Sequence, residues 1–312
     1  MRVLAALCLC FSAFAQPEDL GEIGASEGPA WHPKLGLLFT GQGRIQQLAS
    51  DRKVKVFRDP AGRPNGLLVD QQGRLIVCEQ ENRRVTRTEG DGSITVLAER
   101  FENMLFNSPN DLTIDSKGRI YFSDPRYGRR EGMEIRDSSG RTVEGVYRID
   151  APGVVHRVLG HEVDRPNGVL VSPGDEFLFV ADNNNNNEGG ARKLWRFRLK
   201  AEGSVDAASR KLIFDWGTSR GPDGVKMDSA GRLYVAAGLN KPRPPYETAD
   251  PHRGGIYVLS ADGKLLRFHP VPFDEVTNCA FGDLDGRTLY ITAGGHLLRM
   301  RVDTPGWVSG RQ

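Results

Sequence analysis

The sequence predicts an all-β fold, a six-bladed β-propeller whose four-stranded antiparallel blades surround a central channel. A short phrase returns six times along the 312 residues: an Asn, Asp or Glu, usually beside Gly or Pro, then an apolar run, a turn and a second apolar run. We call the first oxygen-bearing residues of these phrases the ring residues: Glu27, Asn65, Asn110, Asn167, Asp223 and Asn278. Such a repeat, without a segment of useful helical length, is typical of a propeller.

Each repeat is predicted to begin with two strands joined by a tight turn. A glycine lies eight residues after the ring residue in four repeats, and the fourth repeat shifts it by one: Gly73, Gly118, Gly174, Gly231 and Gly286. A fixed glycine is typical of a hairpin turn that needs a positive φ. The runs after these turns are rich in β-formers and cover 74–77, 119–122, 177–180, 232–235 and 288–291. Two further alternating runs follow in most repeats, for example 145–149 and 155–159.

The last repeat lacks an outer strand. It has runs near 287–292 and 296–302, followed only by a polar tail. Residues 19–24, ahead of the first repeat, are predicted to supply the missing strand, because this would close the ring and cover two exposed edges. No linker rich in Pro, Gly or Ser divides the chain, so residues 16–312 are predicted to form a single propeller domain.

Composition and the first residues predict an exported globular protein. The chain is 38% hydrophobic and 26% charged, and its net charge of +2 gives little support for nucleic-acid binding. Residues 1–15 have one positive charge, a short apolar core and a small-residue ending, the pattern of a secretory signal peptide cleaved before Gln16. This core is too short to span a membrane as a helix. We therefore expect a periplasmic or secreted protein; the alternative is an apolar N-terminus that stays attached.

Two cysteines, Cys78 and Cys279, would remain after that cleavage. They lie at different offsets in repeats two and six, which makes the close Cβ approach of a disulfide improbable. We interpret both as buried, unreactive thiols. No tail or amphipathic helix in the sequence suggests a protein partner.

The predicted topology places a pocket at one mouth of the channel. The first strand of each blade lines the channel, so the ring residues lie at its mouth, and the second strands return toward the same face. Long insertions follow three second strands, over 124–144, 182–193 and 238–254. Ring residues and overhanging loops therefore share one face, where we expect a small-molecule site.

The ring residues have the chemistry of a site for a hard cation. Glu27 and Asp223 bring carboxylates and the other four bring amide oxygens, without His or Cys. Oxygen donors with two carboxylates suit Ca²⁺, or Mg²⁺ and Mn²⁺ with retained waters, and argue against a structural zinc site. The alternative is that Asn-Gly and Asp-Gly are ordinary turn dipeptides. Six in equivalent positions favour the metal site.

Several phrases resemble one superfamily, that of gluconolactonase, regucalcin (senescence marker protein) and the luciferin-regenerating enzyme. They are Glu27-Gly28-Pro29-Ala30-Trp31, Ser108-Pro109-Asn110-Asp111-Leu112, Tyr121-Phe122-Ser123-Asp124-Pro125-Arg126-Tyr127-Gly128, Arg165-Pro166-Asn167-Gly168-Val169 and Gly221-Pro222-Asp223-Gly224-Val225. The resemblance covers nearly all of the expected mature chain. It implies a six-bladed propeller with one divalent cation at the channel mouth, usually Ca²⁺, with Zn²⁺, Mg²⁺ or Mn²⁺ as alternatives.

The resemblance also implies roles for individual residues. Glu27, Asn167 and Asp223 match the family's core metal ligands, and Asn110 matches an Asn that binds metal in some branches and substrate in others. Ser108 stands where the regucalcin branch has Arg, and the phrase Ser-Pro-Asn-Asp is more similar to the bacterial gluconolactonase branch.

The expected reaction is hydrolysis of a sugar lactone. The cation would polarise the carbonyl, and Asp223 would act either as general base for an attacking water or as the nucleophile itself. We expect Asn65, Asn110 and Asn278 to face the substrate. Arg126 and Tyr127, at the head of the first insertion, are expected to bind substrate oxygens or the product carboxylate, although Arg126 could equally be a solvated loop cation.

Two other functions fit the same pattern. The scaffold and cation could serve a phosphotriesterase-like hydrolase, in which the cation polarises P=O, and activity on organophosphates without lactones would select it. A propeller that binds sugar or metal without turnover would keep the same ring residues. No Gly-x-Ser-x-Gly motif or Ser/His/Asp arrangement supports a covalent serine hydrolase.

Overall fold

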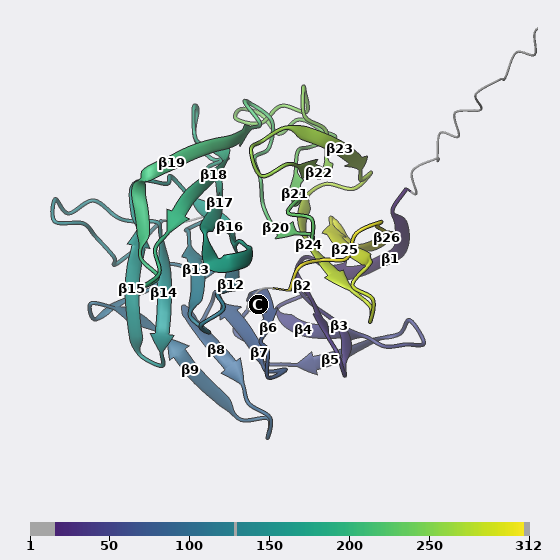
Figure 1. Ribbon diagram of the computed structural model, residues 1–312, viewed down its shortest axis with the longest axis horizontal. Helices are drawn as coiled ribbons and strands as arrows, with labels where there is room; N and C mark the ends of the chain where they lie inside the picture. The colour runs from purple at the N-terminus through teal and green to yellow at the C-terminus, as the bar shows by residue number, and fades with distance from the viewer. Residues whose placement is uncertain (1–15, 128–129, 309–312) are drawn as a thin grey trace, which may run out of the picture.

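The computed structural model describes residues 16–127 and 130–308, and it contains six four-stranded antiparallel sheets around a central channel (Figure 1). The predicted six-bladed β-propeller is thus confirmed. The signal peptide predicted over residues 1–15 lies outside the described residues. No helix in the described part of the chain is long and apolar enough to cross a membrane.

Five blades use strands that follow one another along the chain, in order from the channel outward. Blade 1 has β2 (Glu27–His32), β3 (Gly36–Gly41), β4 (Arg44–Leu48) and β5 (Val54–Arg58), and blade 2 has β6 (Pro64–Val69), β7 (Leu75–Glu79), β8 (Arg84–Thr88) and β9 (Ile94–Ala98). Blade 3 has β12 (Leu112–Ile114), β13 (Ile120–Asp124), β14 (Gly145–Ala151) and β15 (Val154–Leu159). Blade 4 has β16 (Pro166–Val171), β17 (Phe177–Asn183), β18 (Arg192–Leu199) and β19 (Val205–Asp215), and blade 5 has β20 (Val225–Met227), β21 (Leu233–Ala237), β22 (Gly255–Leu259) and β23 (Leu265–Pro270).

The sixth blade joins the two ends of the chain, as predicted. Its strands are β24 (Val276–Gly282), β25 (Thr288–Ala293), β26 (Gly295–Arg301) and, on the outside, β1 (Glu18–Ala25). Strand β1 pairs antiparallel with β26, with Glu18 opposite Arg299 and Asp19 opposite Leu298. The pairing covers the edge of β26 that would otherwise be open.

The turns between first and second strands carry a repeated polar motif. Asp70 accepts hydrogen bonds from the backbone N–H of Gln72 (3.0 Å) and Arg74 (2.8 Å), and its carboxylate pairs with the Arg74 guanidinium at 2.7 Å. Asp115 with Arg119, and Asp228 with Arg232, repeat this arrangement. The predicted turn glycines all have positive φ: Gly73, Gly118, Gly174, Gly231 and Gly286. Because each first strand runs from its ring residue to this turn, the motif lies at the channel end opposite the ring residues.

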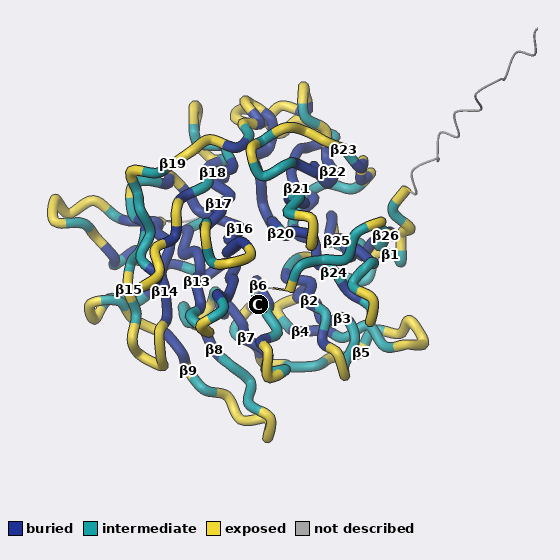
Figure 2. Tube along the Cα trace, viewed as in Figure 1, coloured by how far each residue is buried: buried dark blue, intermediate teal, exposed yellow. Residues whose placement is uncertain are grey.

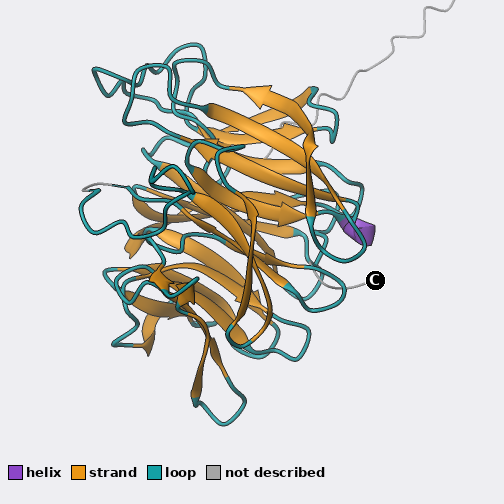
Figure 3. Ribbon diagram, turned by 90° about the vertical axis from the view of Figure 1, so that its left-hand side faces the viewer, coloured by secondary structure: helices purple, strands orange, loops and turns teal. Residues whose placement is uncertain are grey.

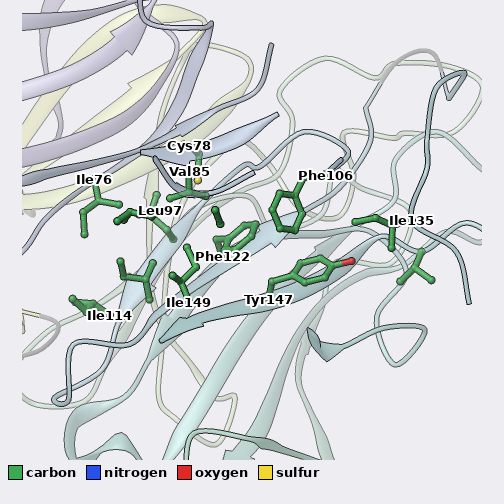
Figure 4. Close-up of a cluster of buried hydrophobic side chains, with 14 residues drawn as sticks. Ile76, Cys78, Val85, Leu97, Phe106, Ile114, Phe122, Ile135, Tyr147 and Ile149 are labelled. Carbon is green, nitrogen blue, oxygen red and sulfur yellow. The ribbon is translucent and has the colours of Figure 1, made fainter. Parts of the chain in front are cut away.

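Apolar side chains pack between neighbouring blades. Figure 2 shows buried inner strands, such as β16, and more exposed outer strands, such as β15. Figure 4 shows the cluster between blades 2 and 3, in which Ile76 and Val85 face Phe122 and Tyr147. Cys78 and Cys279 are buried free thiols, as predicted. Figure 3 shows the strands stacked between loops at the two faces; the helix visible there is the short 3₁₀ turn Pro173–Asp175.

One short ribbon between blades and three longer segments within blades complete the chain. A two-stranded ribbon of β10 (Arg100–Phe101) and β11 (Met104–Leu105) leads from blade 2 to blade 3. The segments 125–144, 184–191 and 238–254 link second to third strands in blades 3, 4 and 5. These correspond to the predicted insertions and lie at the end of the channel where the ring residues are.

Candidate functional site

A cavity of about 480 Å³ lies at the mouth of the channel where the first strands begin. Five ring residues line it: Glu27, Asn65, Asn110, Asn167 and Asp223. The three insertions add Tyr127, Asn185 with Asn186, and Arg243 with Glu247, respectively. Every residue that lines this site cavity has a polar side chain. Such a lining suits a ligand rich in hydroxyl or carbonyl groups rather than an apolar one.

Backbone hydrogen bonds between adjacent blades bring the ring residues together. The N–H of Gly66 donates to the carbonyl of Asn110 (2.7 Å), and the N–H of Gly168 donates to the carbonyl of Asp223 (3.1 Å). A Cβ on Gly168 would lie 2.2 Å from that carbonyl oxygen, closer than any side chain tolerates. The glycine after the ring residue therefore permits the close approach of two blades. The dipeptides Asn65-Gly66 and Asn167-Gly168 lie inside the first strands β6 and β16. The alternative that they are ordinary turn dipeptides therefore does not apply to these two.

The Glu27 carboxylate is held by two donors. Its Oε2 accepts hydrogen bonds from the N–H of Gly28 (3.1 Å) and from the amide of Asn278 (3.0 Å). Burial raises the pKa of Glu27 to about 7, and the nearby charge of Asp111 adds to this rise. The two hydrogen bonds and Lys226 act in the opposite direction.

Asp223 is buried, with 3% of its surface exposed. Burial raises its pKa well above the ordinary value, and the negative charge of Glu27 is the second cause. Arg220, whose guanidinium lies 3.9 Å from Asp223 Oδ2, and Asn167, a hydrogen-bond donor, lower it. The other carboxylate oxygen, Oδ1, is buried without a hydrogen-bond donor among the described residues. Two carboxylates thus share one desolvated site with little compensating positive charge.

Amide side chains complete the wall beside these carboxylates. Asn110 is 3% exposed, and its Oδ1 is buried without a donor from the described chain. The Asn167 amide nitrogen donates to the Tyr127 hydroxyl (2.9 Å), which in turn donates to the backbone carbonyl of Asn183 (3.2 Å). Because burial raises the pKa of Tyr127, its hydroxyl stays protonated and can make this second bond. The pair fixes how Asn167 presents its amide to the cavity.

Two residues expected to contact substrate lie outside the lining of the site cavity. Arg126 donates to the backbone carbonyls of Asn107 (3.0 Å) and Glu131 (3.3 Å), so its guanidinium organises the insertion. Asn278 is 2% exposed and donates to Glu27. In this structure, the side chains of Arg126 and Asn278 therefore donate hydrogen bonds to neighbouring protein groups.

Sequence reasoning missed several polar residues at the site. Arg220 precedes Asp223 by three positions and pairs with Glu275 at 2.7 Å and Glu247 at 3.3 Å. Lys226 in β20 lies 3.6 Å from Asp111 and 3.4 Å from the Asn278 amide oxygen, across the channel. Lys226 could have been noticed in the sequence, because a lysine stands there in an otherwise apolar first strand. The remaining missed lining residues are Gln80, Arg243, Glu247, Glu275 and Thr277. Asn185 and Asn186 belong to the run Asn183 to Asn187, which the sequence predicts as a polar turn near the mouth with one member in contact with the ligand, and they do line the cavity.

The donor set that could hold a cation is made of carboxylates and amides together. Within residues 16–127 and 130–308, no three His, Cys, Asp or Glu side chains group as a metal site. A cation at this mouth would therefore need the amide oxygens of Asn110 and Asn167 beside Glu27 and Asp223. Oxygen donors of this kind are typical for hard cations.

The fold and this polar cavity define a propeller with a small-molecule site at one channel mouth. Residues 25–295 match the SMP-30/gluconolactonase/LRE-like region, and the chain belongs to this family. The family resemblance expected from the sequence is thereby confirmed.

The relatives of this chain include a gluconolactonase and a pentonolactonase. The gluconolactonase of Zymomonas mobilis is 28% identical over 309 residues, covering 91% of this chain and 80% of its own length. The pentonolactonase XacC of Haloferax volcanii is 26% identical and covers 86% and 81%, respectively. The structure of XC5397 from Xanthomonas campestris, described as a gluconolactonase, is 28% identical with a TM-score of 0.73, over 93% of this chain and 89% of that one.

Proposed function

We propose that this protein hydrolyses a sugar lactone with the help of one divalent cation, most simply Ca²⁺, held by Glu27, Asn110, Asn167 and Asp223. The observation that carries the proposal is the all-polar site cavity, in which the buried carboxylate of Asp223 and the half-buried carboxylate of Glu27 stand among amide side chains. Its relatives support the substrate class, since two of them are a gluconolactonase and a pentonolactonase. A lactone of a sugar acid carries several hydroxyl groups, and these match an amide-rich wall.

The residues at the site fit a cation. Asn110 Oδ1 and Asp223 Oδ1 are buried oxygens without a hydrogen-bond donor in the described chain, and a buried acceptor left without a partner is unfavourable. A hard cation would satisfy both oxygens and would offset the repulsion between Glu27 and Asp223. When bound, the cation would supply a Lewis acid that polarises the lactone carbonyl and stabilises the developing oxyanion.

The chain's own residues divide the remaining work. Asp223 takes the proton from the water that attacks the lactone carbonyl, and Arg220, 3.9 Å away, favours its charged form. Tyr127 holds the Asn167 amide, and Asn278 holds Glu27, so both act as positioning residues. Asn65 and Gln80 line the cavity beside them and offer amides to the sugar hydroxyls.

The first test is hydrolysis of glucono-1,5-lactone, followed by proton release, with protein stripped by a chelator and then supplied with Ca²⁺, Mg²⁺, Mn²⁺ or Zn²⁺. We expect activity to return with at least one cation, and to fall at least 100-fold in Asp223→Asn and Glu27→Gln, about the loss typical for a catalytic base. A second readout is the rise in melting temperature caused by the cation, which should be lost in both variants. Wild-type protein that binds a cation but hydrolyses no lactone would refute the proposal and direct the search to organophosphates.

A single-turnover experiment in H₂¹⁸O distinguishes the two roles for Asp223. With Asp223 as base, the first turnover places ¹⁸O in the product carboxylate. With Asp223 as nucleophile, its attack opens the lactone and forms an anhydride; water that then attacks the Asp223 carbonyl carbon leaves the label in the protein and an unlabelled carboxylate oxygen in the product. Label in Asp223 after one turnover therefore identifies the nucleophilic route.

A further inference from the structure

Arginines precede three ring residues, and they differ in their partners. Arg165 pairs with Glu144 at 2.9 Å, and Arg220 pairs with Glu275 at 2.7 Å. Arg63, in the phrase Arg63-Pro64-Asn65, is exposed instead. Its guanidinium makes no hydrogen bond, ion pair or ring contact within the described chain. Of these three arginines in the described ranges, Arg63 is therefore the one whose charge is free beside the channel mouth.

Two acids close to Arg63 in the sequence or the fold already pair with other residues. Asp59 lies 3.9 Å from Arg44, and Glu79 pairs with Arg58 and, at 2.7 Å, with Arg84. The backbone of Arg63 also has a φ of 47°, a left-handed conformation that residues with a Cβ adopt rarely. The Arg63 guanidinium thus makes no ion pair within the described part of the fold, and its backbone is held in an unusual conformation.

Arg63 lines a second cavity that continues from the site. This side cavity has a volume of about 520 Å³ and lies over blades 1 and 2, with Arg63 and Gln42 in its wall. Three residues line both cavities: Glu27, Asn65 and Gln80. One ligand can therefore contact the proposed cation ligands and Arg63 together. Either volume is in the range of small-molecule sites.

We propose that Arg63 is a specificity-determining residue that binds an anionic group of the substrate, a carboxylate or a phosphate, at the end remote from the lactone carbonyl. The inference rests on the proposed function of the site. It makes the preferred substrate an aldonolactone with a terminal carboxylate or phosphate. Arginine suits both groups because its planar guanidinium donates two parallel hydrogen bonds. Arg220 and Arg243 are less suited, since each already pairs with Glu275.

The test compares a neutral lactone with anionic ones. Wild-type protein, Arg63→Gln and a control, Arg52→Gln, are assayed with glucono-1,5-lactone, a glucarolactone and 6-phosphogluconolactone. Arg52 is also exposed with positive φ, but it lies in the β4–β5 turn at the opposite face. We expect Arg63→Gln to lower kcat/KM for the anionic lactones by about 10- to 100-fold. Hydrolysis of the neutral lactone should change less than about twofold, and Arg52→Gln should match wild type.

The carboxylate and phosphate arms show which anion Arg63 prefers. An equal loss on neutral and anionic lactones, or no loss on either, would overturn the proposal. If wild-type protein hydrolyses none of the three, the proposed function fails, and calorimetry still tests Arg63 with the open-chain acids. Glucarate or 6-phosphogluconate should then bind at least 10-fold more tightly than gluconate, and Arg63→Gln should remove most of that difference. A difference that survives in Arg63→Gln would refute the role of Arg63.

Discussion

Asn278 donates a hydrogen bond to Glu27 over 3.0 Å, and the two residues are 251 positions apart in the chain. The bond crosses the junction between the last blade and the first. The other amide atom of Asn278 accepts from the N–H of Cys279 at 2.9 Å, which fixes the rotation of the amide. The residue proposed as a metal ligand in the first blade is therefore oriented by the last blade.

We predict that Asn278→Ala weakens cation binding about 10-fold or more, because a residue that orients a metal ligand typically contributes that much. Calorimetric titration with Ca²⁺ measures the affinity. The matched control is Asn82→Ala, since Asn82 donates to Glu79 over 2.8 Å in the same way but does not line the site cavity. Equal Ca²⁺ affinity in the two variants would show that Asn278 does not support the site.

Gly168→Ala should destabilise the protein by about 1–3 kcal/mol, the usual cost of forcing extra volume into a packed region. The added Cβ would meet the backbone carbonyl of Asp223, so lactonase activity should fall as well. Gly90→Ala is the control, because a Cβ there meets nothing within 4 Å in the described chain. Thermal unfolding and the lactone assay check both effects, and a Gly168→Ala protein as stable and active as Gly90→Ala would contradict the prediction.

Tyr127→Phe should leave the fold intact and lower kcat/KM for the lactone by about 10-fold, a loss of about 1.4 kcal/mol. The change removes the acceptor of the Asn167 amide, so Asn167 loses its fixed orientation. Tyr257→Phe also removes a hydroxyl bonded to a backbone carbonyl, at 2.7 Å, but on a side chain outside the site cavity. Circular dichroism and steady-state kinetics on both variants separate a site effect from general destabilisation.

His269 should make the protein less stable in mild acid. Burial lowers its pKa to about 4, with the charge of Arg267 as a second cause, whereas an unfolded histidine titrates near about 6.5. Below that value the unfolded chain binds a proton that the folded protein does not, so stability falls as pH drops from about 6.5 to about 4. Urea unfolding of His269→Gln across this range should show a shallower loss than wild type. The same substitution at the exposed His161 is the control, and parallel pH profiles for His269→Gln and wild type would rule out this contribution.

Export stays a prediction from residues 1–15. Expression of the full chain in a Gram-negative bacterium, followed by fractionation, should place the protein in the periplasm. Mass spectrometry should find Gln16 as its first residue. A cytoplasmic protein that retains residues 1–15 would contradict both the cleavage site and the expected compartment.

Much of the fold could be predicted because it repeats along the chain. A turn glycine such as Gly73 and the phrase around each ring residue are local patterns, and each determines one hairpin. The use of residues 19–24 in the last blade also followed from counting strands. That Glu27, Asn110, Asn167 and Asp223 line one cavity could be predicted for the same reason, since equivalent positions in the repeats occupy equivalent places in the fold.

The pairing of side chains was much harder to predict. Arg126 has the sequence context of a substrate contact, yet its donors go to two backbone carbonyls of its own insertion and the segment before β12. Arg220 reaches Glu247 and Glu275, which lie in different segments, so its pairing depends on how the loop 238–254 folds over the mouth. The close approach of Gly168 to Asp223 likewise depends on the spacing between blades.

The pairing of β1 with β26 has a consequence for how the chain folds. Glu18 and Arg299 form an ion pair at 2.8 Å although they are 281 positions apart in the chain. On the ribosome, β1 emerges first and has to wait for nearly the whole chain before its partner exists. The first five sheets can form from neighbouring segments during synthesis, whereas the sixth must assemble last. Loss of either end, by proteolysis or a truncating mutation, would therefore expose strand edges that favour aggregation.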